Sequence, residues 1–196
     1  HLPWLLEEFD IRPCNALDPG CGNGKNAVWL AEHGFQVVGI DLAPSAIEQA
    51  RELARQRSVG EQTPHDGRDR ATGDETAAPR GSARFIVGSF PEDVDAPGRD
   101  FGLVIERGFL QHQTNPRRLD RTLASIARLM RDDAIFYSLI TAREGNRGHF
   151  GPPLWTRQEI ERGVRRHFTI VSMTHSVFTP GERGSMAAWA TVMSRR

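Results

Sequence analysis

The feature that most constrains this chain is a group of three closely spaced glycines, Gly20, Gly22 and Gly24, in the stretch DPGCGNGKNAVWL. The glycines follow a short apolar run at residues 15–19 and precede a segment with helical spacing at residues 26–33. A glycine turn between a strand and a helix lets the backbone approach a ligand closely, and the helix points its positive end at that ligand. The turn therefore predicts a nucleotide-type site, although several nucleotides use such turns.

The segments beyond this turn continue to alternate between strand and helix patterns. Residues 36–42 form a second apolar run, and Pro44 opens a second helix with an apolar stripe. This alternation predicts an α/β fold with a parallel sheet covered by helices. Further helices are predicted at residues 116–130 and after Thr156, which forms a capping box with Glu159. The remaining strands are predicted at residues 84–90, 101–108, 133–141, 169–179 and 186–194, the last two as an antiparallel hairpin, which makes seven strands in all.

The length and pattern of the chain indicate one domain over residues 1–196, because neither a repeat nor a second set of elements is visible. Residues 58–82 interrupt the pattern with many Gly, Pro, Asp and Arg and almost no large apolar residue. Such a segment buries too little surface to repay the cost of ordering, so we expect a flexible insertion there.

Charge and cysteine content argue against several classes of partner. Lys+Arg and Asp+Glu each total 25, and no basic stripe is present, so nucleic acid is not expected as a partner. The apolar runs fall short of the roughly 18 residues that a membrane helix needs. Cys14 and Cys21 are too few for a metal site, and we expect reduced thiols in a cytoplasmic protein.

Two aspartates at the turn distinguish between the possible ligands. Asp41, at the end of the second strand, suits the ribose hydroxyls of a dinucleotide or of another nucleoside. Asp18 precedes the glycines, where a bound pyrophosphate would meet like charge at a cost of about 4 kcal/mol at about 4 Å and an effective dielectric near 20. S-adenosylmethionine instead presents an ammonium, a carboxylate and a sulfonium, so Asp18 attracts it. A turn-forming role before Pro19 is the alternative for Asp18.

The stretch LDPGCGNGKNAVWLAEHGFQVVGIDLAPSAIEQARELA resembles the first two motifs of class I S-adenosylmethionine-dependent methyltransferases. Within that class, the sequence of this stretch is most similar to the small-molecule branch that contains thiopurine and tellurite-resistance methyltransferases. The resemblance is strong over residues 16–54 and follows the segment order of nearly the whole chain. It implies a Rossmann-like, doubly wound, mostly parallel sheet in the order 3-2-1-4-5-7-6, with the seventh strand antiparallel and helices on both faces.

The resemblance also implies a set of cofactor contacts. Asp18 and the backbone from Gly20 to Gly24 would hold the methionine end, and Asp41 the ribose. Leu42 would pack on the adenine, Ser89 and Phe90 would lie at its edge, and Glu106 and Arg107 would lie where the cofactor meets the acceptor. The implied set comprises Asp18, Gly20, Cys21, Gly22, Gly24, Asp41, Leu42, Ser89, Phe90, Glu106 and Arg107.

Candidates for the acceptor side lie after the fourth and fifth predicted strands, at the edge where ligands bind in open α/β sheets. His112 is the candidate base, with loop capping as the alternative, and Glu106 is more typical of a residue that orders backbone. Gln111 is a candidate polar contact, and Gln113 is a similar one. His149, Phe150 and Trp155 are candidates for an aromatic wall, with packing of a surface loop as the alternative. No cluster of His, Cys and Asp has metal-ligand spacing.

Together these features predict a methyltransferase that uses S-adenosylmethionine and acts on a small molecule, with a thiol or hydroxyl acceptor favoured. A nicotinamide-dependent oxidoreductase is the first alternative, because Gly22, Gly24 and Ala27 match G-x-G-x-x-A. A cofactor-binding accessory protein without a working acceptor site is the second alternative. Neither the acceptor nor the oligomeric state follows from the sequence.

Overall fold

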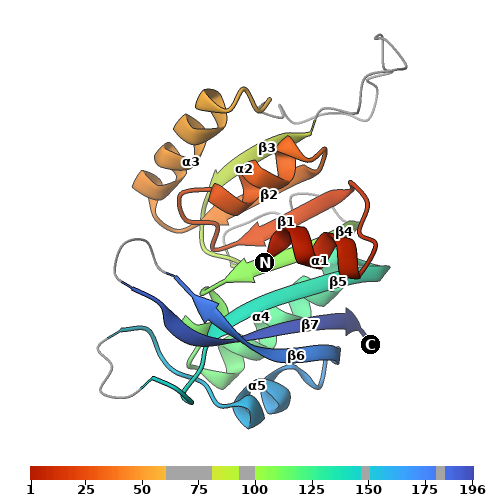
Figure 1. Cartoon of the computed structure of the whole chain (residues 1–196), viewed down its shortest axis with the longest axis vertical. Helices are drawn as coiled ribbons and strands as arrows, with labels where there is room; N and C mark the ends of the chain where they lie inside the picture. Colours follow the sequence, from red (N-terminus) through yellow and green to blue (C-terminus); the bar gives the residue numbers. More distant parts are fainter. Residues whose placement is uncertain (61–80, 93–99, 147–150, 180–183) are drawn as a thin grey trace. The chain divides into compact units, whose positions relative to one another are not determined.

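The structure is a computed structural model that describes residues 1–60, 81–92, 100–146, 151–179 and 184–196. Its strands form one seven-stranded sheet in the order β3-β2-β1-β4-β5-β7-β6 (Figure 1). The pairs β1–β2, β2–β3 and β4–β5 are parallel, whereas β7 is antiparallel to both β5 and β6. The predicted fold class, strand order and closing hairpin are therefore confirmed.

The chain divides into two compact units, His1–Ser89 and Phe90–Arg196, which are described separately. The first unit contains α1 (Leu2–Glu8), β1 (Asn15–Pro19), α2 (Lys25–Glu32), β2 (Gln36–Asp41), α3 (Pro44–Gln56) and β3 (Ser82–Val87). The second unit contains β4 (Phe101–Arg107), the 3-10 turn η1 (Leu110–His112), α4 (Pro116–Leu129), β5 (Met130–Thr141), α5 (Arg157–Val164), β6 (Phe168–Phe178) and β7 (Met186–Arg195).

In the first unit, α2 packs on β2 and β3, and α3 packs on β3 and α2. The strands carry apolar side chains on both faces, as expected for parallel strands covered by helices. The fully buried side chains of this core include Leu17, Leu30, Phe35, Ile40 and Ile47. This core fixes the carboxyl ends of β1 and β2, where the glycine turn and Asp41 lie.

In the second unit, α4 packs on β5, and α5 packs on α4 and β6. Asn115 caps α4 by accepting hydrogen bonds from the backbone N–H groups of Arg117 and Arg118. The predicted capping box of Thr156 and Glu159 begins α5 and is confirmed. These two caps fix the starting points of the helices that follow the carboxyl ends of β4 and β5.

Two elements differ from the sequence-based expectation. The helix α1 was not predicted, and it buries Leu2 and Leu5, which lie three positions apart on one face. The strand β5 begins at Met130, which was assigned to the end of the preceding helix. Its pairing with β4 shifts between Phe101 and Leu103, so residues 131–133 are exposed and do not show the pattern of a buried strand.

Residues 61–80 of the predicted insertion lie outside the described residues, but its two ends are described. Gly60 forms an isolated bridge with Ser82, and the Gly60 carbonyl accepts a hydrogen bond from the Ala83 N–H at 3.0 Å. The insertion therefore leaves and rejoins the unit at neighbouring points at the start of β3. Within the described residues, no helix is both long and apolar enough to cross a membrane.

Candidate functional site

The glycine turn joins β1 to α2 with all three glycines in the left-handed region, at φ values of 75°, 54° and 74° for Gly20, Gly22 and Gly24. A side chain is strained at such φ values. A Cβ on Gly22 would have no neighbour within 4 Å, so this backbone borders open space. A Cβ on Gly24 would lie 2.6 Å from the Ala50 Cβ. Gly22 is thus available to a ligand, whereas Gly24 allows α2 and α3 to approach each other closely.

Asp41 is tied to the same turn by its carboxylate. One of its oxygens accepts a hydrogen bond from the Gly22 N–H at 2.8 Å, and the other accepts from the Ala43 N–H at 2.9 Å. Each carboxylate oxygen can accept a further hydrogen bond. The side chain is therefore held in one orientation and can still accept from two adjacent hydroxyls of a ribose.

Asp18 and Asp41 lie on either side of the turn and act on the same thiol. Asp18 is 1% exposed near the end of β1. Burial raises the pKa of the Cys21 thiol, and the negative charges of Asp18 and Asp41 raise that pKa further. The Cys21 side chain therefore stays neutral between two carboxylates. This charge pattern favours a ligand with an ammonium or sulfonium group and disfavours a pyrophosphate.

Two exposed apolar side chains flank Asp41. Leu42 follows Asp41 and is 68% exposed, and Val87, which pairs with Asp41 in the β2–β3 register, is 46% exposed. Large apolar side chains at the carboxyl edge of a parallel sheet are positioned to cover an aromatic base. Leu42 was predicted for this role, whereas Val87 was assigned only to the interior of a strand. Ser89 follows in the same unit and is half-buried.

In the second unit, Glu106 organises the turn that follows β4. One carboxylate oxygen accepts hydrogen bonds from the Phe109 N–H at 2.9 Å and the Leu110 N–H at 3.1 Å, and the other is hydrogen-bonded to the Ser138 hydroxyl. Both oxygens are thus engaged in holding η1 against β5. This arrangement supports the expectation that Glu106 orders backbone.

The Glu106 carboxyl is completely buried, and its pKa is raised to about 7. Burial is the largest cause, and the hydrogen bonds from Ser138 and from the backbone of Leu110, Phe109 and Gly108 oppose it. Glu106 consequently changes its charge near neutral pH, although its oxygens are committed to the turn.

Gln111 and Trp155 extend the same network. The Gln111 side-chain oxygen accepts from the Thr141 N–H at 3.0 Å and from the Thr141 hydroxyl at 2.8 Å. The Trp155 indole N–H donates to the Gln111 carbonyl at 3.1 Å. These contacts fix the turn to β5 and to the segment before α5. The two hydrogen bonds from Thr141 occupy the side-chain oxygen of Gln111. The side-chain nitrogen of Gln111 lies near Gly108, where it would be 3.3 Å from an added Cβ.

His112 ends the η1 turn and is exposed, and within the described part of the chain its ring has no hydrogen-bond partner. A catalytic base is usually oriented by a neighbouring group. Among the described residues the Oε1 atom of Gln113 also has no hydrogen-bond partner, but the Gln113 side chain, unlike that of His112, is buried. Gln113 was predicted, like Gln111, as a polar contact, and its burial gives it an unsatisfied acceptor.

The remaining predicted residues are placed as follows. Phe90 is buried and packs edge-to-face on Phe109, the residue that precedes η1, with ring centroids 6.4 Å apart. Burial raises the pKa of the Tyr137 phenol, and the positive charge of Arg107 opposes part of this rise. His149 and Phe150 lie outside the described residues. Among the residues that are described, no group of three His, Cys, Asp or Glu side chains could hold a metal ion.

Comparison with known proteins identifies a family that agrees with the geometry of the glycine turn. A family model described as thiopurine S-methyltransferase matches residues 5–192. The match confirms the predicted resemblance to this family of methyltransferases, and it supports S-adenosylmethionine over a nicotinamide as the cofactor. The two-carboxylate turn, the open space at Gly22 and the exposed Leu42 and Val87 fit that cofactor.

Individual relatives share shorter stretches. Over 45 residues the chain is 49% identical to a ribosomal RNA small subunit methyltransferase C of Alcanivorax borkumensis, a match over 22% of this chain and 14% of that protein. Over 55 residues it is 40% identical to a 2-heptyl-1-hydroxyquinolin-4(1H)-one methyltransferase of Mycobacteroides abscessus, covering 28% of this chain and 24% of that protein. The chain thus spans less than a quarter of the length of these two relatives.

A solved structure resembles the whole fold. The Burkholderia thailandensis 1,6-didemethyltoxoflavin-N1-methyltransferase, with bound 1,6-didemethyltoxoflavin and S-adenosylhomocysteine, superimposes with a TM-score of 0.68 at 22% identity. The match covers 97% of this chain and 75% of that one. At this level of identity the likeness concerns the fold.

Proposed function

Because this chain belongs to the thiopurine S-methyltransferase family, we propose that it transfers a methyl group from S-adenosylmethionine to the thiol or hydroxyl group of a small heteroaromatic molecule. The observation that carries this proposal is the pair of carboxylates at the glycine turn, Asp18 and Asp41, beside the open backbone of Gly22. Asp18 attracts the cationic end of the cofactor, and Asp41 accepts from the ribose hydroxyls. Leu42 and Val87 cover the adenine.

S-adenosylmethionine supplies a methyl group already activated on a sulfonium, so the acceptor's electron pair forms the new bond to the methyl carbon as the carbon–sulfonium bond breaks and neutral S-adenosylhomocysteine leaves. The chain's residues therefore mainly align the reactants, and alignment supplies several kcal/mol of the barrier. A base is needed only for an acceptor that arrives protonated with a high pKa. An acidic acceptor such as a thiol loses its proton to water before the transfer, and its anion is the nucleophile.

The residues near the end of β4 favour an acidic acceptor. One Glu106 oxygen is engaged by the turn and the other by the Ser138 hydroxyl, and His112 has no orienting partner among the described residues. A thiol with a pKa of about 8.5 is already ionised to a few per cent at neutral pH. We therefore favour a thiol over a hydroxyl.

The names of the relatives support a ring-shaped acceptor. The family description contains a thiopurine, and the M. abscessus relative is named for a hydroxyquinolinone. Both names describe a heteroaromatic ring with sulfur or a hydroxyl group. The A. borkumensis relative is named for ribosomal RNA, so RNA belongs among the test acceptors, although the zero net charge of this chain provides no general attraction for it.

The test is a methyl-transfer assay in which S-adenosylhomocysteine formation is measured and the product mass is determined. The acceptors are mercaptopurine, the matched pair thiophenol and phenol, and a ribosomal RNA fragment. We expect transfer to both thiols, slower transfer to phenol and none to RNA. Cofactor binding without turnover on any acceptor would instead support the accessory-protein alternative.

The role of His112 is tested in the same assay with His112→Ala. For a thiol acceptor we expect the variant and the unmodified chain to have equal rates at each pH from about 6 to 9, a window that contains the thiol pKa. A loss of about a hundredfold, the lower end of what a general base contributes, would identify His112 as the base.

A further inference from the structure

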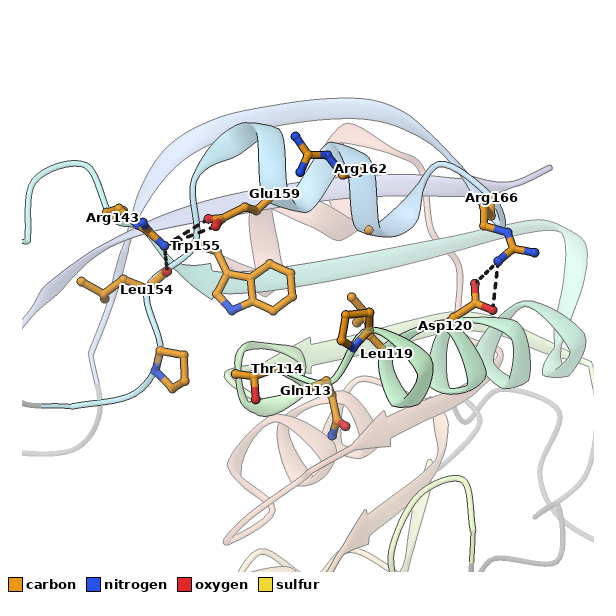
Figure 2. A pocket seen from close by; sticks show the side chains of 13 residues that line it. Gln113, Thr114, Leu119, Asp120, Arg143, Leu154, Trp155, Glu159, Arg162 and Arg166 are labelled. Atoms are coloured by element: carbon orange, nitrogen blue, oxygen red, sulfur yellow. Dashed lines mark hydrogen bonds and ion pairs between the residues drawn. The ribbon is translucent and has the colours of Figure 1, made fainter.

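A pocket of about 530 Å³ lies between α4 and α5 in the second unit. Figure 2 shows it from close by, with side chains from both helices and from the segment before α5 around it. Its volume is typical of sites for small molecules. None of the residues predicted to hold the cofactor lines it. Its described lining consists of Gln113, Thr114, Pro116, Leu119, Asp120, Arg143, Pro153, Leu154, Trp155, Glu159, Arg162, Gly163 and Arg166.

The interior of the pocket is apolar and has a fixed aromatic wall. The Trp155 indole lies between Leu154 and Leu119 in Figure 2. Its N–H donates a hydrogen bond to the backbone carbonyl of Gln111 at 3.1 Å, and this bond sets the orientation of the ring. A flat apolar molecule can therefore lie against an indole that needs no rearrangement to receive it.

Gly163 lets α5 approach the apolar wall of this pocket closely. A Cβ at this position would lie 3.2 Å from Leu119 Cδ2 and 3.9 Å from Trp155 Cζ3. Glycine inside a helix costs about 1 kcal/mol relative to alanine. The chain therefore carries a residue unfavourable to α5 at the point where a side chain would push against Leu119 and reach Trp155.

The charged groups around the pocket leave one positive charge in excess. Arg143 pairs with Glu159 at 3.3 Å, and Arg166 pairs with Asp120 at 3.3 Å. Within the described residues, Arg162 has no ion pair as close as these. Arg162 does contribute to lowering the pKa of Glu159, after the larger effect of the Thr156 hydrogen bonds and alongside Arg143. Three arginines thus face two carboxylates, and Arg162 is the one available to an added anion.

We propose that this pocket binds a small aromatic carboxylic acid, with its ring against Trp155 and Leu119 and its carboxylate at Arg162. An arginine fork suits a carboxylate because it donates two parallel hydrogen bonds. A neutral analogue of the same shape keeps the ring contacts and loses this interaction. The site is additional to the cofactor site, and binding to it requires neither cofactor nor methyl transfer.

Isothermal titration of the full chain with indole-3-acetate and with its neutral analogue indole-3-acetamide tests the proposal. We expect the acetate to bind at least about tenfold more tightly than the amide, which corresponds to one charge-assisted hydrogen-bond pair. Arg162→Gln should remove this preference and leave amide binding unchanged. Arg128→Gln, which removes an exposed arginine on α4 outside the pocket, is the matched control and should leave the preference intact.

A second variant tests the apolar part of the site. Gly163→Val pushes a side chain against Leu119 and Trp155, which disrupts the apolar wall that receives the ring, and should abolish binding of both probes. Circular dichroism establishes whether this variant folds, and the exposed Arg162→Gln decides the proposal if it does not. Equal affinity for acetate and amide, absence of binding at millimolar probe, or an equal effect of Arg162→Gln and Arg128→Gln would overturn it. The assay contains no cofactor, so its result is independent of the proposed methyl transfer.

Discussion

The buried carboxyl of Glu106 should make the stability of this protein fall as the pH rises from about 4.5 to about 7. Burial raises the Glu106 pKa from 4.5 to about 7 in the folded chain. Between these values the folded state keeps a proton that the unfolded state has released. The folded state therefore binds more protons, and the free energy of unfolding decreases with pH across this window. Below it both states are protonated, and above it both are ionised.

The size of the effect follows from the shift. A pKa change from 4.5 to about 7 corresponds to about 3 kcal/mol of lost stability at 1.36 kcal/mol per unit. Glu106→Gln keeps an oxygen that can accept from the Phe109 and Leu110 N–H groups but cannot ionise. The variant should therefore lack this loss, and its stability relative to the unmodified chain should rise by about 3 kcal/mol between pH 4.5 and pH 8.

Urea unfolding at a series of pH values measures this difference, because other groups titrate alike in both proteins and cancel. Glu48→Gln, an exposed change on α3, is the control for removal of one negative charge. A stability difference between Glu106→Gln and the unmodified chain that stays constant with pH would refute the argument. A difference that changes in the opposite direction would mean that the hydrogen bonds outweigh burial.

Three further predictions concern the first unit. Gly24→Ala should destabilise the chain by about 1–3 kcal/mol in urea unfolding, because Gly24 has a φ of 74° and its Cβ would lie 2.6 Å from that of Ala50; an unchanged midpoint would contradict this packing. Val87→Ser should weaken S-adenosylhomocysteine binding several-fold in calorimetry without lowering the melting temperature, and equal affinity would remove Val87 from the adenine site. Replacing residues 61–80 with a short Gly-Ser linker should preserve the melting temperature, since Gly60 and the start of β3 are already bridged; unfolding would show that the replaced segment is needed.

Much of the fold could be predicted because its signals are local. The glycine turn, the Val- and Ile-rich β2 and the capping box at Thr156 each follow from neighbouring residues. The order of strands came from the family resemblance, since pairing between distant strands leaves little trace in one sequence. The start of β5 was missed because residues 131–133 are exposed where the β4–β5 register shifts.

The candidate site was predictable where a residue's chemistry depends on its position along the chain. Asp18 and Asp41 flank the glycines in sequence and also act on the same Cys21 thiol in the structure. Val87 could not be identified, because a valine in a strand pattern gives no sign that its side chain is exposed. The pocket at Trp155 depends on contacts between separate helices, which periodicity within one helix does not reveal.

The most direct test of the central claim is a calorimetric titration of S-adenosylhomocysteine into the unmodified chain and into Asp41→Asn, with NADH as the competing cofactor. The asparagine keeps one oxygen for the Gly22 or Ala43 N–H. It removes the negative charge and one of the two oxygens that would accept from the ribose hydroxyls. We predict micromolar binding to the unmodified chain, at least about tenfold weaker binding to Asp41→Asn, and no binding of NADH. Equal affinity of the two proteins, or tighter binding of NADH, would contradict the account.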